Sequence, residues 1–342
     1  MRYESSDRFI FTSSKDNSIR ITDTRDDASY KYDEVKKQPA PAWWQWQIVH
    51  NSSVFDIILD KDENFLFSGG DDSHILVYDI RNVRDRSKMR YHAYCIFENT
   101  CFNTQSLKFF GNSYLFIGGF SNLTVVRLDL FYQKVKKQDS DHQEIFQTEI
   151  QAQRHKTSRT DGNSYTLKLK SEDNIVKTYY DLARSSIVDI CVHHTRDYLF
   201  AASTAGEIKV LSIRALNNPN QALTPKALTD APYFTFPRFY DTCLMKMQLG
   251  NGDRLMIVLT NNNLLLLYSI TDMNDLQENP IRIIDQLHPK SDILGFYLRD
   301  SNSMLWSYAR DKSLRCTDFK EVMSRFISKN QVTKSNFNGF YS

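Results

Sequence analysis

The sequence predicts an all-β fold built from repeated antiparallel meanders, and three observations lead to this prediction. An apolar strand, a turn closed by Asp and a second apolar strand recur along the chain. A strand with period-two alternation precedes most copies. The composition, with 41% hydrophobic and 13% aromatic residues, is ample for a sizeable core. Repetition of this kind indicates the architecture before any single residue is interpreted.

The clearest copy covers residues 65–81. Counting from Ser68, Asp72 stands at plus four, Ile75 and Val77 at plus seven and plus nine, and Tyr78 with Asp79 at plus ten and plus eleven. Two further copies keep both Asp positions, which are Asp16 and Asp23 in one and Asp311 and Asp318 in the other. Three weaker copies keep mainly the apolar positions. The reference positions of the six copies are Thr12, Ser68, Gly118, Ala201, Val258 and Ser307.

Each copy is expected to form two neighbouring antiparallel strands joined by the turn. A further strand, the leading strand, is expected before most copies. The expected leading strands cover residues 54–59, 107–110, 187–192 and 293–298. Three tryptophans, Trp43, Trp44 and Trp46, are expected to lie in the outer strand of the first unit. Alternation puts Trp44 and Trp46 on one face, so Trp44 is a candidate anchor for a partner. The alternative is that all three pack under the loop 30–42.

This repeat resembles the WD40 family, whose units form four-stranded blades of a β-propeller. The resemblance covers nearly the whole chain and implies six recognisable blades, with seven as the alternative. In that family a His, a Ser or Thr, the turn Asp and a Trp form a hydrogen-bonded tetrad. Carried over to this chain, the second unit offers His50, Ser68 and Asp72, with Tyr78 in place of Trp. No unit has the full tetrad, so we expect degenerate repeats that are stabilised mainly by packing.

The spacing of the repeats predicts long loops within a single domain that covers residues 1–342. The intervals between plus-eleven positions are 56, 50, 83, 57 and 49 residues, against about 40–45 for a compact blade. The longest interval predicts a polar insertion at about 131–164. A hairpin from 166–170 and 175–180 is expected to follow it. That hairpin is either a degenerate seventh blade or an outer strand with an insertion, and we favour the insertion.

The first copy begins at its second strand, so its inner strand is missing locally. We expect residues 322–327 to supply an outer strand, and residues at about 335–342 to supply a terminal closing strand, since WD40 rings can close by joining both termini in one blade. Two alternatives are that Met1 is not the natural start and that a partner chain completes the ring.

A search for chemistry predicts no catalytic centre, no cofactor and no metal site. Walker, Rossmann, Cys-x-x-Cys and zinc-protease motifs are absent from the sequence. His193 and His194 are adjacent, so on a strand their side chains would face opposite sides. Asp71 and Asp72 are typical of turn residues that accept backbone amides. Asp56 and Asp189 occupy equivalent places in two leading strands, which indicates a shared structural role.

Charge and cysteine usage are typical of an intracellular protein, cytoplasmic or nuclear. Net charge is +2, and neither a signal peptide nor a membrane span is visible. The cysteines are odd in number and widely spaced, and we interpret them as buried reduced thiols; they are Cys95, Cys101, Cys191, Cys243 and Cys316. Two basic stretches, Lys134, Lys136 and Lys137 and then Arg154, His155, Lys156 and Arg159, fall in the insertion. Acids interleave them, which favours a solvated loop over contact with RNA, acidic protein or lipid.

The resemblance places the candidate partner-binding residues on one rim. In WD40 proteins the loop between the second and third strands opens on the so-called top face. The residues just before the turn Asp position are Lys15, Asp71, Ser121, Thr204, Asn261 and Arg310. Closing the ring would bring Lys15 near Arg310, so we predict a cationic seam facing an acidic sector at Asp71.

These observations favour a non-enzymatic scaffold that binds other proteins, as a subunit of a larger intracellular assembly. One alternative comes from the second repeat, whose residues 66–81 resemble the box of WD40 substrate receptors of cullin ubiquitin ligases. By that resemblance Arg81 would contact the adaptor. Enzymatic, phospholipid-binding and RNA-binding propellers are less favoured alternatives, and the Phe-Arg-Arg-Gly motif of phosphoinositide-binding propellers is absent.

Overall fold

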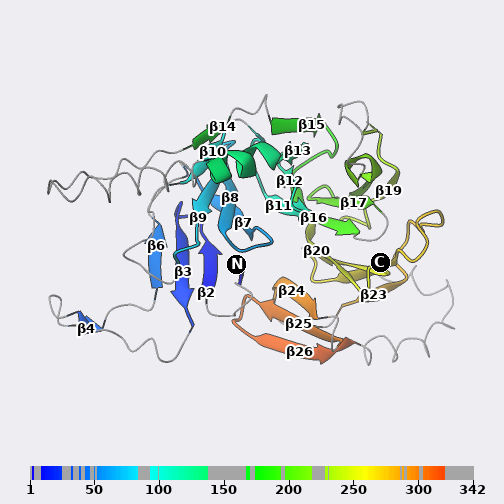
Figure 1. Ribbon diagram of the computed structural model, residues 1–342. Coiled ribbons are helices and arrows are strands. Elements are labelled where there is room, and N and C mark those ends of the chain that lie inside the picture. Colours follow the sequence, from blue (N-terminus) through cyan, green and yellow to red (C-terminus); the bar gives the residue numbers. More distant parts are fainter. Residues whose placement is uncertain are drawn as a thin grey trace, which may run out of the picture. The chain divides into compact units, whose positions relative to one another are not determined.

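The computed structural model is built of short β-strands (Figure 1). It describes residues 2–319 apart from 4–8, 25–31, 34–37, 40–42, 47–49, 51, 84–92, 99, 138–166, 170–173, 194–196, 218–227, 230, 286, 289–290 and 300–302. The chain divides into two compact units. Unit 1 comprises Met1–Ile190 and Ile213–Ala231, and unit 2 comprises Cys191–Ser212 and Pro232–Ser342.

Unit 1 contains three sheets that follow the sequence repeats. The first has the order β1 (Arg2–Tyr3), β2 (Phe9–Ser13), β3 (Ile19–Asp23) and β6 (Trp43–Trp46). The second has the order β7 (Val54–Leu59), β8 (Phe65–Gly70), β9 (Ile75–Asp79), β10 (Cys95–Phe97) and β14 (Leu167–Leu169). The third has the order β11 (Ser106–Phe110), β12 (Tyr114–Gly118), β13 (Leu123–Arg127) and β15 (Ile175–Tyr179). A small hairpin pairs β4 (Tyr32–Asp33) with β5 (Gln38–Pro39), and Arg214–Asn217 forms a short 3-10 helix.

Three more sheets continue the series. The fourth has the order β16 (Ile187–His193), β17 (Tyr198–Ser203), β18 (Ile208–Ser212) and β19 (Phe234–Phe236). The fifth has the order β20 (Leu244–Gly250), β21 (Leu255–Thr260), β22 (Leu265–Ser269) and β23 (Arg282–Ile284). The sixth has only β24 (Ile293–Arg299), β25 (Met304–Ala309) and β26 (Leu314–Asp318).

The all-β prediction and the antiparallel meander are confirmed, but the blade count is corrected. Five sheets in the described residues have four or more strands, so five complete blades replace the six or seven that the repeats predict. Among the described residues the sixth repeat forms three strands. The residues expected to supply its outer strand, 322–327, lie outside the described part of the chain. The closing strand expected at about 335–342 also lies outside it.

Residues 167–179 do not form the expected hairpin. The first strand, β14, pairs in parallel with β10 as a fifth strand of the second sheet. The second strand, β15, pairs with β13 as the outer strand of the third sheet. The interpretation as an outer strand with an insertion is therefore the one that the pairing supports, and no separate seventh blade forms from these residues.

Of the two edge strands of the first sheet, the outer one was predicted from the sequence and the inner one was not. Strand β6 pairs with β3, so Trp43–Trp46 is the outer strand, as expected. The inner position is occupied by β1, in which Arg2 pairs with Phe11 and Tyr3 with Ile10. The residues before Arg8 thus supply the local inner strand that the repeat pattern lacks.

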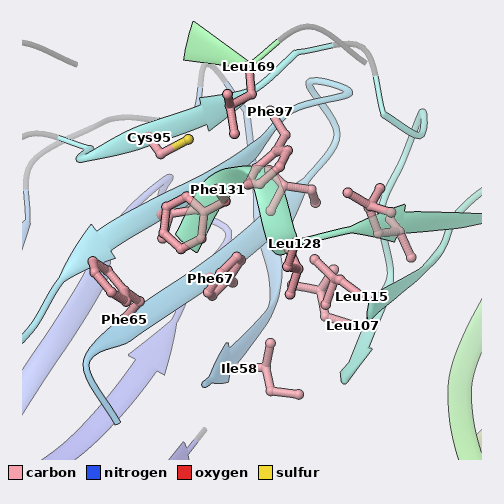
Figure 2. Close-up of a cluster of buried hydrophobic side chains, with 14 of the residues drawn as sticks. Ile58, Phe65, Phe67, Cys95, Phe97, Leu107, Leu115, Leu128, Phe131 and Leu169 are labelled. Atoms are coloured by element: carbon pink, nitrogen blue, oxygen red, sulfur yellow. The ribbon is translucent and has the colours of Figure 1, made fainter. Parts of the chain in front are cut away.

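Part of the predicted polar insertion is a helix that packs on the core. Residues 129–137 are helical, and Phe131 and Val135 are buried on one face while Lys134, Lys136 and Lys137 are exposed. Figure 2 shows Phe131 among the side chains of Phe65, Phe67 and Phe97. Its ring lies 5.2 Å from that of Phe65, edge to face. The insertion therefore begins after this helix, because its i, i+4 apolar pair has a core to bury against. The second basic stretch, 154–159, lies outside the described residues.

Neighbouring sheets of unit 1 are joined through their inner strands. Strand β7 lies beside β2 and β11. The carboxylate of Asp56 accepts the amide of Ile57 at 2.9 Å and the amide of Leu107, on the next sheet, at 2.8 Å. Asp189 accepts the amide of the following residue, Ile190, at 2.9 Å. Both aspartates thus bind backbone amides at the same place in their strands, as expected for a structural role.

The cysteines are free, and three of the five are buried. Burial raises the pKa of the Cys101 thiol to about 11 and also raises that of Cys95. Cys243 is half-buried and Cys316 is exposed on β26, so the expectation of buried thiols is wrong for Cys316. Among the described residues, every helix is too short or too polar to cross a membrane.

Candidate functional site

The turns between second and third strands share one geometry in the three strongest repeats. The carboxylates of Asp16, Asp72 and Asp311 each accept the amide two residues further on, at 3.1, 3.4 and 2.9 Å. The residue after each Asp has a positive φ, which is 65° at Asn17, 61° at Ser73 and 65° at Lys312. An Asp that accepts the i+2 amide and a left-handed residue are typical of tight turns. The hairpins that begin at Thr12, Ser68 and Ser307 are therefore geometrically equivalent.

Hydrogen bonds lower the pKa of two of the turn carboxylates, those of Asp16 and Asp311. Hydrogen bonds from Ser18, the side-chain bond first, lower the pKa of Asp16. The side chain and backbone of Ser313 likewise lower the pKa of Asp311. A hydroxyl that donates to a carboxylate favours its charged state. These acids therefore act as fixed acceptors that close the turns.

The turn of the third sheet is one residue shorter than the others. In the second sheet Gly69 pairs with Ile75, which leaves residues 70–74 in the turn. In the third sheet Gly118 pairs with Leu123, which leaves residues 119–122. The left-handed residue shifts accordingly and is Ser121, with φ 62°. Counting a constant number of residues from the reference position therefore misplaces this one turn.

Backbone hydrogen bonds show which residue of the short turn is equivalent to the others. The amides of Asp71, Asn261 and Arg310 each donate to a carbonyl of the segment just before the inner strand of the same sheet. In the third sheet the amide that does so is that of Phe120, which donates to Phe102 at 3.1 Å. The structural equivalent of Asp71 is thus Phe120 rather than Ser121.

The predicted rim residues lie on these turns. Lys15, Asn261 and Arg310 are exposed, and Asp71, Ser121 and Thr204 are half-buried. Arg310 forms an exposed ion pair with Asp292 at 3.4 Å. Lys15 belongs to unit 1 and Arg310 to unit 2, so the cationic seam stays a prediction. The side chain of Trp44 lies outside the described residues.

The second repeat forms the hydrogen-bonded group that its residues predict. His50 is buried, and its Nδ1 lies 2.9 Å from the carboxylate of Asp72 while its Nε2 lies 2.8 Å from the hydroxyl of Ser68. The Tyr78 hydroxyl also hydrogen-bonds Ser68 and so occupies the fourth place. Burial raises the pKa of Tyr78.

A second group of this kind was not predicted from the sequence. His288 is buried, with its Nε2 at 2.9 Å from Ser307 Oγ and its Nδ1 at 3.0 Å from Ser313 Oγ. The Ser313 hydroxyl also hydrogen-bonds Asp311 at 2.6 Å. Ser313 thus bridges His288 and Asp311, whereas in the second repeat the equivalent residues, His50 and Asp72, contact each other directly. The His position before the inner strand, 19 residues ahead of Ser307 against 18 ahead of Ser68, is the signal that could have found it.

Arg81, the residue of the adaptor box, is bound within its own repeat. Its Nε and Nη2 atoms donate to the two carboxylate oxygens of Asp79 at 2.9 and 2.6 Å. Its guanidinium carbon lies 5.3 Å from the ring centre of Phe65. The side chain remains 32% exposed. These contacts account for the Arg at this position through local structure, and contact with an adaptor stays a prediction.

Of the two adjacent histidines, only His193 is described. His193 is buried beside Asp253, with 3.8 Å between Nδ1 and the carboxylate, and His194 lies outside the described residues. Within the described ranges, no three His, Cys, Asp or Glu side chains gather closely enough to hold a metal ion.

Comparison with family models gives one match. Residues 46–79 match the model described as WD domain, G-beta repeat. This segment contains the leading strand β7, the turn of the second sheet and the group formed by His50, Ser68 and Asp72. A comparison with the curated proteins finds no match. The matched repeat is also the one whose turn and hydrogen bonds are most complete.

Proposed function

We propose that the chain is a WD40-repeat protein, as the match of residues 46–79 and the repeated sheets support, and that it is a non-enzymatic scaffold that binds other proteins through the rim of its second-to-third-strand turns. The observation that carries this proposal is the construction of that rim. In five of the six sheets the described turn is bonded to the backbone of another segment, as when Val54 donates to Ser14 and Thr100 to Ser73. Side chains such as Lys15 and Asp71 are thus presented from a fixed backbone.

A fixed rim favours binding because little conformational entropy is lost on association. Its exposed positions differ in charge and chemistry from turn to turn, which supports recognition of a specific partner rather than one repeated ligand. We further propose that the partners belong to a larger intracellular assembly, in the cytoplasm or the nucleus. Buried free thiols at Cys95, Cys101 and Cys191 support a reducing compartment.

The test is affinity purification of the tagged protein from its own cells, with quantitative mass spectrometry of the proteins recovered. We expect a reproducible set of partners that decreases at least tenfold with the rim variants Asp71→Lys and Arg310→Glu. Glu278→Lys, an exposed charge change outside the turns, is the control and should leave the set unchanged. Recovery of no reproducible partner by the unmodified protein would contradict the proposal.

An adaptor role for the second repeat is the alternative proposal. It is supported by the family match to this repeat and by the partial exposure of Arg81. Arg81→Ala is expected to abolish co-purification of the ligase adaptor while leaving the rim partners in place. Absence of any adaptor among the proteins recovered with the unmodified chain would end this alternative.

A further inference from the structure

Three large aromatic side chains stand exposed on one part of unit 1. Phe102 is 63% exposed, Phe120 is 52% exposed and Tyr180 is 76% exposed. They come from three different loops, which follow β10, β12 and β15. We call them the Phe102 patch. Large apolar side chains normally avoid water, so their concentration on adjoining loops calls for a functional explanation.

Backbone hydrogen bonds bring the three loops together. The amide of Phe120 donates to the carbonyl of Phe102 at 3.1 Å. On the other side of the short turn, the amide of Asp181 donates to Asn122 Oδ1 at 3.1 Å and that of Ala183 donates to Ser121 at 3.3 Å. The loop that carries Phe120 is therefore bonded on one side to the loop of Phe102 and on the other to the loop of Tyr180.

The patch depends on the shortened turn of the third sheet. At the equivalent place, the turns of the second, fifth and sixth sheets carry the polar residues Asp71, Asn261 and Arg310. Only this turn, among those with the equivalent hydrogen bond, carries an aromatic residue there. The third sheet is thus chemically different from its neighbours at the position that we propose contacts partners.

The backbone beneath the patch is closely packed. A Cβ on Gly119 would lie 2.4 Å from both Cys101 Sγ and the carbonyl oxygen of Phe102. The hydroxyl of Thr124 donates to the carbonyl of Thr100 at 3.2 Å. Each of the three aromatic residues is followed by a residue with positive φ, namely Asn103, Ser121 and Asp181. The loops therefore hold their aromatic residues in defined positions.

The charges on the surrounding segments are mainly acidic. Residues 70–74, 98–104, 119–122 and 180–186 contain the acids Asp71, Asp72, Glu98 and Asp181 and one basic residue, Arg184, besides His74. Asp72 is bonded to His50, while Asp181 is exposed beside Tyr180. An aromatic surface with an excess of acid attracts cations both by charge and through the faces of the rings. The same charges oppose nucleic acid and anionic lipid.

From this arrangement we propose that the Phe102 patch binds an extended basic segment of a partner protein, with Lys or Arg side chains over the aromatic rings and against Asp181. The inference rests on the proposed scaffold function and specifies the partner's chemistry at one part of the rim. The aliphatic stems of Lys and Arg would cover the exposed rings, while their charged ends would reach the acids.

The test measures binding of two labelled synthetic peptides to the full chain by fluorescence anisotropy. One peptide alternates Arg with Leu, and the other alternates Glu with Leu. We expect the basic peptide to bind at least tenfold more tightly than the acidic one, and to weaken as salt is added. Phe102→Ala, Tyr180→Ala and Asp181→Lys should each weaken it by about tenfold, the effect of losing one strong contact.

Two controls separate the patch from general effects. Tyr240→Ala removes an aromatic residue that is 59% exposed in unit 2, and Glu278→Lys changes the charge elsewhere by the same amount as Asp181→Lys. Both should bind the basic peptide as the unmodified chain does. Thermal melts by circular dichroism identify any variant that fails to fold, and the exposed Asp181→Lys change then serves in place of the alanine variants.

The outcomes distinguish this inference from the proposed function. Equal binding of both peptides, binding of neither, or unchanged binding by all folded patch variants would overturn the Phe102 patch as a basic-segment site. If cellular partners are still recovered in that case, the scaffold function stands. If the peptide results are as expected but the unmodified chain recovers no cellular partner, the scaffold function fails.

Discussion

At the scale of single residues, the buried imidazoles of His50 and His288 connect the segment before an inner strand to the second strand of the same sheet. Each uses both ring nitrogens, and each has a Ser on the second strand as one partner. The family resemblance offered His50, Ser68 and Asp72 for the second repeat, because these three residues stand at family positions. The His288 group was not predicted. In it, His288 and Asp311 are connected through the hydroxyl of Ser313, and Ser313 does not stand at one of the tetrad positions of the family.

We predict that Ser68→Ala destabilises the protein by about 1–3 kcal/mol, because it leaves buried polar atoms of His50 and Tyr78 without their shared partner. Urea denaturation followed by tryptophan fluorescence measures the change. Ser203→Ala is the matched control, since the hydroxyl of that buried Ser donates only to a carbonyl within its own turn. An equal loss in both variants would contradict a special role for the His50 group.

The buried carboxyl of Asp60 should make the free energy of unfolding depend on pH. It is buried, and this burial raises its pKa, while its Oδ1 accepts the amides of Asn64 and Phe65 at 2.8 and 2.9 Å. A carboxyl with a raised pKa in the folded state binds its proton more tightly there than when unfolded. Burying the charge therefore costs stability above that pKa, and this cost is relieved as pH falls through it.

Asp60→Asn should keep both amide bonds through its side-chain oxygen and remove the cost of burying charge. We expect the variant to match or exceed the unmodified chain in free energy of unfolding near neutral pH, and to lose that advantage in mildly acidic buffer. Urea denaturation at both pH values measures this. The stability difference between the variant and the unmodified chain should favour the variant more near neutral pH than in acid. The opposite trend would contradict a raised pKa for Asp60.

At the scale of elements, the turns of the first three sheets are bonded to the segment that leads into the next sheet, as when Val54 donates to Ser14, Thr100 to Ser73 and Ile187 to Gly119. In the third sheet the loss of one turn residue is accommodated by Gly119, against which the loop of Phe102 packs directly. The helix at 129–137 also depends on its neighbours. Most of its residues are polar, and it packs on the core through the buried side chains of Phe131 and Val135. Neither feature follows from the repeat pattern alone.

Gly119→Ala tests the packing of that loop. The added methyl group would meet Cys101 Sγ and the Phe102 carbonyl, so we expect destabilisation of about 1–3 kcal/mol, as for other overpacked sites. We also expect faster hydrogen exchange of the Phe120 amide, whose bond to Phe102 would lengthen. Asn112→Ala, at an exposed turn of the same sheet, is the control. Unchanged exchange at Phe120 would exclude close packing of the loop.

At the scale of the whole molecule, the untested prediction is the cationic seam. If the first and last repeats are neighbours, as the family resemblance implies, Lys15 and Arg310 should lie close together. Cysteines introduced by Lys15→Cys and Arg310→Cys should then form a link with a short bifunctional reagent. Asn261→Cys paired with Lys15→Cys is the control and should link poorly. Linking of the control pair alone would exclude the seam.

The repeat pattern by itself determined the main strands and the second-to-third-strand turns of the strongest repeats, while the family resemblance offered the His50 group. These are local features, set by alternation of apolar residues, by an Asp that accepts nearby amides and by a left-handed turn residue. The leading strand Val54–Leu59 has the bounds that its alternation predicts, and the turns at Asp16, Asp72 and Asp311 are equivalent.

Only the tertiary structure decided the partners of segments that are distant in sequence. It paired β14 with β10, placed Phe131 in the core, bridged His288 to Asp311 and made Phe120 the equivalent of Asp71. Each outcome depends on which surfaces meet after the sheets form. A one-residue deletion in a turn changes such contacts without disturbing the alternation of the flanking strands, so the repeat pattern does not record it.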